Sequence, residues 1–298
     1  MGRRGEKGKG RSYCDHCTAL FSVLFFVTFV CFVGNSPAQS LESIQADLAS
    51  GNTELKRNAL FQIKNLRNEV ASRLAVPLLN DPDPIVRATA ASSIEFLPES
   101  DVAVYLRPLL ADKDAFVRRE AAYALRKDRT GIDTSFLVKL MLEDKVMEVR
   151  SAAAIALGSG DIFAMDWLVG VLKKKPTDDK EFLRRSAARS IGQLAQMIRT
   201  GKSIVVTPQN FLPEKYKEMP VGEPVTKTFQ AFRDALGVLT KVLVNKKESD
   251  DTRREAAFAL GAIGDASSVA LLRSNLNSRD NYLAEICKEA LLKIEHKQ

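Results

Sequence analysis

The chain has 298 residues, of which 45% are hydrophobic, and a formal net charge of +7 at neutral pH. The first 38 positions hold five of the 44 basic and two of the 37 acidic residues, so the remainder carries +4. A charge this weak and this well mixed argues against the clustered basic surface of a nucleic-acid-binding protein. We expect no nucleic-acid partner.

Residues 1–38 have the parts of a secretory signal peptide. Five basic residues precede an uncharged apolar run from Ala19 to Val33, and Ser36-Pro37-Ala38 supplies small residues ahead of a cleavage point. The run is shorter than the roughly 20 residues that a spanning helix needs, so we expect cleavage after Ala38 and a secreted or periplasmic product. The alternative is an uncleaved anchor at residues 19–34, which would then be the chain's only membrane contact.

The cysteines predict neither a metal site nor a disulfide framework. Cys14-Asp15-His16-Cys17 resembles a metal or redox motif, but no second ligand pair and no βαβ pattern accompanies it. It also lies in the segment expected to be removed. Beyond residue 38 the only cysteine is Cys287, and a lone thiol on the apolar side of a helix is usually a small core residue.

A motif recurs seven times between residue 39 and the C-terminus, which we treat as one repeat domain. An apolar residue and a basic one are followed three positions later by two small residues and then by Leu or Ile, as in Val117-Arg118, Ala121-Ala122 and Leu125. The basic positions lie 31 to 34 residues apart, with one interval of 69. Such a period predicts stacked helix pairs, in which the motif marks the second helix. The basic positions are Lys56, Arg87, Arg118, Arg150, Arg184 and Arg253, with Cys287 in the corresponding place of the last copy.

Each motif position has a physical role in such a pair. The two small residues let the second helix approach its partner, because larger side chains would overpack there. The Leu or Ile four residues on fills the core. Polar residues four positions ahead of the basic residue are expected to cap the second helix at its N-terminus. These are Asn52, Asp83 and Asp114, and in later copies Asp144 and Asp179 are expected to cap slightly longer helices.

Glycines and aspartates mark the expected ends of the second helices. Gly158 and Gly261 are predicted C-cap residues. Asp161 and Asp265 follow them and are expected to begin the next first helix.

Arginines supply the structural and the functional candidates on the second helices. We call Arg87, Arg118, Arg150, Arg184 and Arg253 the arginine ladder. It is expected to reach the capping acids of neighbouring repeats and to set their geometry, with an anion-binding row as the alternative. Charged residues beside the ladder are expected to face solvent along the concave surface, either as solvated faces or as partner contacts. The partner-binding candidates among them are Arg119, Arg185, Arg189 and Arg254, with Glu120 and Glu255 alongside.

The interval of 69 residues contains an insertion. Phe182–Arg199 is predicted as a long second helix and Thr228–Asn245 as the next first helix, which leaves residues 200–227. Four prolines and the triplet Ile204-Val205-Val206 favour a short β-hairpin or an extended loop. Long loops in compact domains are commonly functional or disordered, so a partner-contacting arm, packed decoration and disorder all remain open. Phe211, Lys215 and Tyr216 are its candidate contact residues.

The pattern V-R-x-x-A-A-x-A-L-G, with Gly160-Asp161 and Gly264-Asp265 after it, resembles HEAT repeats of the phycobilin-lyase type. The resemblance covers nearly all of residues 39–298. It implies an all-α, right-handed α-solenoid of about seven helix pairs with one non-helical insertion, whose second helices line the concave face. It also implies that the partners are proteins or extended peptides.

Enzymatic readings are weaker. Beyond residue 38 the only histidine is His296, so a Ser-His-Asp or Cys-His triad is not available, and a metal site would need carboxylates and Cys287 alone. Some HEAT-type proteins are di-iron hydroxylases that use His-Glu pairs, which this sequence lacks. No glycine-rich nucleotide motif occurs.

We therefore interpret the chain as an exported scaffold or adaptor, not an enzyme, without cofactor or metal. It would bind a protein partner through the concave face and the 200–227 insertion. The alternative is an enzyme or enzyme subunit related to bilin lyases or HEAT-type hydroxylases, although bilin lyases act as paired cytosolic subunits. A structural role in an envelope assembly is a third hypothesis. Oligomeric state and partner identity stay open.

Overall fold

The computed structural model describes residues 40–125, 134–159, 162–201 and 224–295. The chain divides into two compact units, residues 1–44 and 45–298. The first unit is described only at residues 40–44, where helix α2 (Leu41–Ala49) begins, so the predicted signal segment 1–38 lies outside the described residues. In the described ranges no helix is both long and apolar enough to span a membrane.

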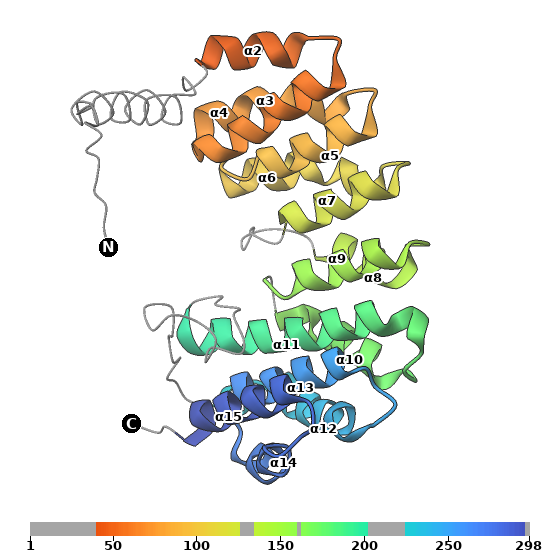
Figure 1. Cartoon of the computed structure of the whole chain (residues 1–298), viewed down its shortest axis with the longest axis vertical. Helices are drawn as coiled ribbons and strands as arrows, with labels where there is room; N and C mark the ends of the chain where they lie inside the picture. The colour runs from red at the N-terminus through yellow and green to blue at the C-terminus, as the bar shows by residue number, and fades with distance from the viewer. Residues whose placement is uncertain (1–39, 126–133, 160–161, 202–223, 296–298) are drawn as a thin grey trace, which may run out of the picture. The chain divides into compact units, whose positions relative to one another are not determined.

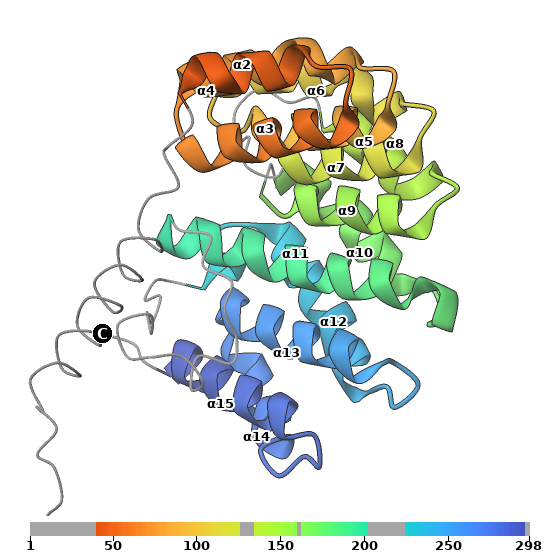
Figure 2. The same cartoon turned by 45° about the horizontal axis from the view of Figure 1, so that its top comes forward.

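The seven predicted second helices are all present in the described ranges, and each contains one copy of the motif. They lie next to one another in chain order: α3 packs on α5, α5 on α7, and so on to α13 on α15 (Figure 1, Figure 2). This stacking of helix pairs is the all-α solenoid that the period predicts. The second helices are α3 (Thr53–Leu66), α5 (Pro84–Ser93), α7 (Ala115–Leu125), α9 (Met147–Leu157), α11 (Glu181–Thr200), α13 (Asp250–Ile263) and α15 (Asn281–Glu295).

Apart from α12, the first helices are shorter than the second helices that follow them, and several include a 3₁₀ turn. In two of them a proline lies at the first or second position of that turn, where a residue without an N–H group cannot continue the α-helical bonds. After α2 they are α4 (Glu69–Ala75) with η1 (Val76–Asn80), α6 (Glu99–Leu106) with η2 (Pro108–Ala111), α8 (Ser135–Glu143), η3 (Ile162–Ala164) with α10 (Met165–Lys173), η7 (Val225–Lys227) with α12 (Gln230–Val244), and η8 (Ala266–Ser268) with α14 (Val269–Ser274); η4 (Asp178–Lys180) precedes α11.

The small residues of the motif lie in the core where second helices meet. Ala121 and Ala122 of α7, for example, are fully buried, and so are Ala256 and Ala257 of α13. Alanine keeps the distance between neighbouring helices short while leucine and isoleucine fill the space between layers. The packing role predicted for these positions is therefore confirmed.

The N-cap predictions are correct for the first three copies. The Asn52 side chain accepts from the Glu54 and Leu55 amides, and Asp83 accepts from the amide of Ile85. Asp114 precedes α7 and accepts from the Phe116 amide at 2.8 Å. Each bond satisfies an amide that the helix itself leaves without an acceptor.

The N-cap predictions for Asp144 and Asp179 are wrong. Asp144 ends α8, and its carboxylate accepts from the Val146 amide in the loop before α9. Asp179 lies inside η4, and Lys180 occupies the N-cap position of α11 without a side-chain cap. The inserted 3₁₀ turn moves the start of α11 past the aspartate.

The C-cap prediction for Gly261 is also wrong, because α13 continues to Ile263 and ends at Gly264, whose φ of 77° favours glycine. Gly261 instead permits a close helix contact. A Cβ atom there would lie 2.5 Å from the Cβ atom of Ala290 in α15. Gly158 does follow α9 as its C-cap residue, and Asp265 begins η8 as predicted. Asp161 lies outside the described residues.

The arginine ladder makes two kinds of contact, ion pairs that join consecutive repeats and hydrogen bonds to carbonyl groups of the same repeat. Arg87 donates to both carboxylate oxygens of Asp112 at 2.9 Å, and Arg118 pairs in the same way with Asp144. Arg150 and Arg253 donate instead to the carbonyl groups of Met141 and Leu243. The acceptor acids are not the N-cap residues, since Asp112 lies two positions ahead of the cap Asp114.

The long interval does not interrupt the stack. Helices α11 and α13 pack directly on each other. The observed bounds of α11 and of the intervening α12 agree with their predicted bounds to within two residues. The described chain stops after Gly201 and resumes at Pro224, where Val225 and Thr226 are buried. The candidate residues Phe211, Lys215 and Tyr216 lie in the part between, outside the described residues.

Candidate binding site on the second helices

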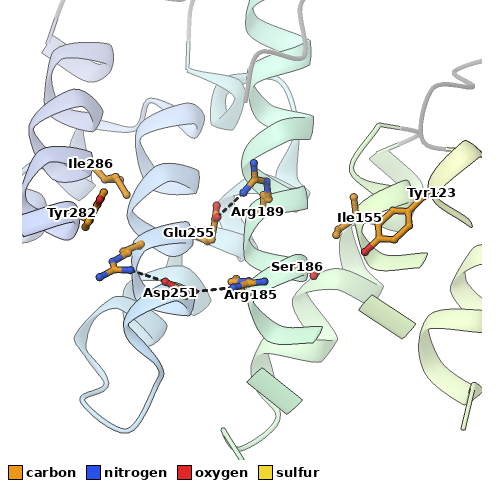
Figure 3. A pocket seen from close by; sticks show the side chains of 10 residues that line it. Tyr123, Ile155, Arg185, Ser186, Arg189, Asp251, Glu255, Tyr282 and Ile286 are labelled. Carbon is orange, nitrogen blue, oxygen red and sulfur yellow. Dashed lines mark hydrogen bonds and ion pairs between the residues drawn. The ribbon is translucent and has the colours of Figure 1, made fainter. Parts of the chain in front are cut away.

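A hollow of about 460 Å³ lies on the exposed face of the second helices (Figure 3). Five helices contribute to its lining, from α7 through α9, α11 and α13 to α15. The side chains are charged in the centre and aromatic or aliphatic on both sides. They are Tyr123, Ile155, Arg185, Ser186, Arg189, Asp251, Arg254, Glu255, Tyr282 and Ile286.

Helical spacing gathers these residues on one face. Arg185 and Arg189 of α11 are four positions apart, and Asp251 and Glu255 of α13 have the same spacing. Residues at this spacing point the same way from a helix. Because α11 and α13 are stacked neighbours, the two pairs face each other.

Ion pairs hold the central charges in place. Arg185 donates to Asp251 at 2.8 Å and Arg189 donates to Glu255 at 2.9 Å, as the dashed lines in Figure 3 show. Asp251 also accepts from Arg254 at 2.6 Å, so one carboxylate serves arginines of two helices. Arg254 donates further to Asp280 ahead of α15, at 2.8 Å.

Aromatic rings support two of the three arginines. The Arg185 guanidinium lies 4.9 Å from the ring centroid of Phe182, one turn earlier in α11. Arg254 lies 5.2 Å from the ring of Tyr282 in α15. A cation over an aromatic face is attracted by the ring quadrupole, and the flat ring also limits the arginine rotamers.

Burial and charge act in opposite directions on Glu255 of the hollow and on Asp280, which pairs with Arg254. Burial raises the pKa of Glu255 above its usual value and outweighs the opposing effect of Arg189. Burial alone would also raise the pKa of Asp280, but the hydrogen bonds from Arg254 lower it below the usual value. The Arg254 pKa is raised by the same hydrogen bond to Asp280, so the pair stays charged across the neutral range.

The structure brings together three of the four candidate arginines of the sequence, and all four are half-buried rather than fully exposed to solvent. Arg119 lies on α7 outside the hollow lining, 4.8 Å from the Phe116 ring and paired with Glu120. The apolar members were missed, although the repeat period contains the signal: Tyr123 and Ile155 occupy the same position, five residues after the ladder arginine, as Arg189 does. The ladder arginines do not line this hollow.

The described residues do not provide a metal-binding donor set. They contain no group of three or more His, Cys, Asp or Glu side chains that could hold an ion. Burial raises the pKa of the Cys287 thiol to about 12, so the thiol stays protonated in the core. Both histidines of the sequence lie outside the described ranges, so an iron site made of His-Glu pairs does not fit the described part of the chain.

Comparisons with known proteins point to the same class of repeat. Residues 42–126 match the model of HEAT repeats, and residues 252–278 match the PBS lyase HEAT-like repeat. Deoxyhypusine hydroxylase-B of Oryza sativa subsp. japonica is 22% identical over 273 residues, which cover 80% of this chain and 87% of that protein.

Two solved structures are similar to this chain. An engineered protein is 23% identical, with a TM-score of 0.50, over 86% of this chain and 68% of the engineered one. The complex of CpcE and CpcF of phycocyanin lyase from a Nostoc species is 21% identical, with a TM-score of 0.47, over 88% of this chain and 90% of that one. At 23% identity the likeness to the engineered protein concerns the fold alone.

Proposed function

Because the chain is a HEAT-repeat protein with repeats of the PBS lyase HEAT-like class, we propose that it is an exported adaptor that binds an extended segment of a protein partner. The hollow between Tyr123 and Ile286 is the centre of the binding face, which lies on the exposed side of the second helices. The insertion at residues 200–227 contacts the same partner as an arm.

The fixed arginines carry this proposal. Arg185, Arg189 and Arg254 come from two stacked helices, and each is ion-paired before any ligand binds. A guanidinium has five N–H donors, so each arginine keeps donors for a ligand after forming its pair. Side chains that are already held in place lose less conformational entropy on binding.

The apolar margins of the hollow suit a polypeptide ligand. Tyr123 and Ile155 lie on one side of the charged centre, and Tyr282 and Ile286 lie on the other. Tyrosine and arginine are the residue types enriched among the energetically dominant contacts of protein interfaces. A ligand that crosses several helices and alternates carboxylate with apolar side chains matches this order of groups.

The lining favours binding over catalysis. Its arginines and acids are occupied in ion pairs, and it contains no histidine or cysteine beside its one serine, Ser186. A serine nucleophile needs a base within hydrogen-bond reach. The lining residues do not supply one, which supports a non-enzymatic role.

The arm and the export proposals rest mainly on sequence. Phe211, Lys215 and Tyr216 give the insertion aromatic and basic contact groups. The C-terminal end of the insertion is anchored, since the Thr226 hydroxyl donates to Asp265 at 2.7 Å. Residues 1–38 supply the proposed export signal.

Site-specific crosslinking in the native host tests the binding face. A photoreactive phenylalanine analogue replaces Ile155 in the full chain, and a matched variant carries it at Val104, an exposed residue of the first helix α6. We expect a single stoichiometric protein adduct from position 155 and none from position 104. Equal adducts from both positions, or adducts from neither, contradict the proposed face.

Deletion of the insertion tests the arm. A short Gly-Ser linker replaces residues 203–222 and leaves Val225 and Thr226 in place, because both are buried. We expect the crosslinked partner to bind at least about tenfold more weakly, which corresponds to about 1.4 kcal/mol. Unchanged affinity rejects the arm but leaves the proposed face intact.

Mass spectrometry of the protein from the native host tests export. We expect a mature chain that begins at Gln39 and is found outside the cytoplasm. A cytoplasmic chain that retains residues 1–38 contradicts export, and a membrane-bound chain that retains them supports the anchor instead.

A further inference from the structure

Lysines at and just after the C-terminal ends of two helices line a second hollow, of about 440 Å³. Lys173 ends α10, Lys174 and Lys175 follow it, and Lys241 lies in the last turn of α12. The hollow's apolar lining comes from Leu172, Val238 and Val242, and we refer to it as the basic hollow.

A buried arginine fixes the lysine-bearing segment. Arg184 of α11 donates to the carbonyl groups of Val171, Leu172 and Lys174 at 2.6 to 3.2 Å. The same guanidinium pairs with Glu248, the one acidic residue of the lining. The acid is therefore occupied, and the backbone that carries the lysines is held against the core.

The four lysines form no ion pair with any described residue, in contrast to the paired arginines of the first hollow. Lys173 and Lys241 lie in the last turns of α10 and α12, where the helix dipole favours a cation. Lys174 is the C-cap residue of α10 and Lys175 follows it, so one helix end carries three lysines in a row. Four like charges around one hollow repel each other, and an anion relieves that repulsion.

We propose that the basic hollow binds an acidic peptide segment of a partner protein, with one aliphatic side chain of the segment on Leu172, Val238 and Val242. A concave site with an apolar base accepts a side chain, whereas a membrane surface needs a flat or protruding basic face. The lining contains no aromatic residue on which a nucleobase would stack. Each lysine acts as a flexible point charge, which suits carboxylates spread along a chain.

This site is independent of the proposed adaptor face. Arg184 and Arg185 are consecutive in α11, and the first lines the basic hollow while the second lines the hollow on the second helices. Consecutive residues of a helix point in different directions. The two sites therefore have separate side chains and separate tests.

A capped peptide of sequence EEEELEEEE is the probe, titrated into the full chain at low salt and followed by NMR. We expect saturable binding that weakens about fivefold when Lys175→Gln and Lys241→Gln are combined, since each exposed charge pair contributes modestly. Lys145→Gln is the matched control, because Lys145 is an exposed lysine in another interhelical loop. That control should bind like the unchanged protein.

Three further titrations decide the ligand. Replacing every Glu of the probe by Gln should abolish binding, and replacing its Leu by Gly should weaken it. Arg185→Ala should leave binding unchanged even if it disrupts the adaptor face. Equal affinity of the lysine double variant or of the Gln probe overturns the proposal, as does binding of phosphatidylglycerol vesicles without binding of the acidic peptide.

Discussion

The guanidinium of Arg184 and the carboxylate of Glu248 form a buried pair across 64 residues of sequence, and each side chain is only 3% exposed. Arg184 lies on α11, before the insertion, and Glu248 precedes α13 after it. The pair joins the two repeats that the insertion separates in sequence, in the same way that Arg87 and Asp112 join consecutive repeats without an insertion.

Removing one partner of this pair should destabilise the protein strongly. Glu248→Ala leaves the Arg184 guanidinium buried without its counter-charge, so we expect a loss of about 3–5 kcal/mol in the free energy of unfolding. Arg73→Ala is the control, because Arg73 pairs with Glu69 and Asp101 at the surface and its removal should change little. Urea denaturation measures both variants. A Glu248→Ala loss as small as that of the control would show that Arg184 does not depend on the pair.

Close helix contacts should make two glycines intolerant of a methyl group. A Cβ atom at Gly192 would lie 2.5 Å from the Phe258 ring, and one at Gly261 would lie 2.6 Å from the Cα atom of Ala290. We expect Gly192→Ala and Gly261→Ala each to destabilise by about 1–3 kcal/mol through overpacking.

Gly237→Ala is the matched control for these glycines. Gly237 is exposed within α12, and nothing lies within 4 Å of the Cβ position. Alanine has the higher helix propensity, so this variant should stabilise by about 0.5–1 kcal/mol. Thermal or urea unfolding of the three variants measures whether each substitution raises or lowers the free energy of unfolding. Stabilisation at Gly261 would contradict the close contact with α15.

Stability should fall in acid through the interrepeat aspartates. Burial alone would raise the pKa of Asp112 and of Asp144, but hydrogen bonds from Arg87 and Arg118 lower both below the usual value. Their stabilisation is therefore full above the unfolded-state pKa of about 3.9 and is lost as the pH falls through the lower folded-state values. Unfolding free energies at pH 6, 4 and 3 measure this loss. Asp144→Asn should be less stable at pH 6 and should lose less on acidification; an equal pH slope would contradict the assignment.

The shared carboxylate of Asp251 should matter more for binding than for stability. It holds Arg185 and Arg254 in the hollow, yet its side chain is 40% exposed, so Asp251→Ala should cost less than about 1 kcal/mol of unfolding free energy. We expect the same variant to weaken the crosslinked partner at least about tenfold, because both arginines lose their fixed position. Unfolding curves and partner titration separate the two effects. A large stability loss with unchanged binding would reverse the assignment.

Local signals in the sequence were sufficient for the helices. The period placed all seven second helices, because each motif copy carries its own apolar spacing, and it placed the caps Asn52, Asp83 and Asp114, because capping acts within one turn. The caps expected at Asp144 and Asp179 are absent for two reasons. Asp144 pairs with Arg118 of the preceding repeat, and a 3₁₀ turn moves the start of α11 past Asp179. A glycine can end a helix or permit a close contact with a second helix. The residues around Gly261 do not show which, because the contacting Ala290 of α15 lies almost 30 residues further along the chain.

The sequence by itself therefore determined the repeat architecture and the small residues at the helix contacts, whereas the arginines beside the ladder, expected to face solvent, are half-buried. Only the tertiary structure decided which of these arginines share a hollow with Tyr123 and Tyr282, that Lys175 and Lys241 line the same hollow, and that Arg184 reaches Glu248. The physical reason is the range of the interactions. Helix formation and capping depend on residues within a few positions, whereas each hollow is made by side chains from different repeats that meet only after the helices have stacked.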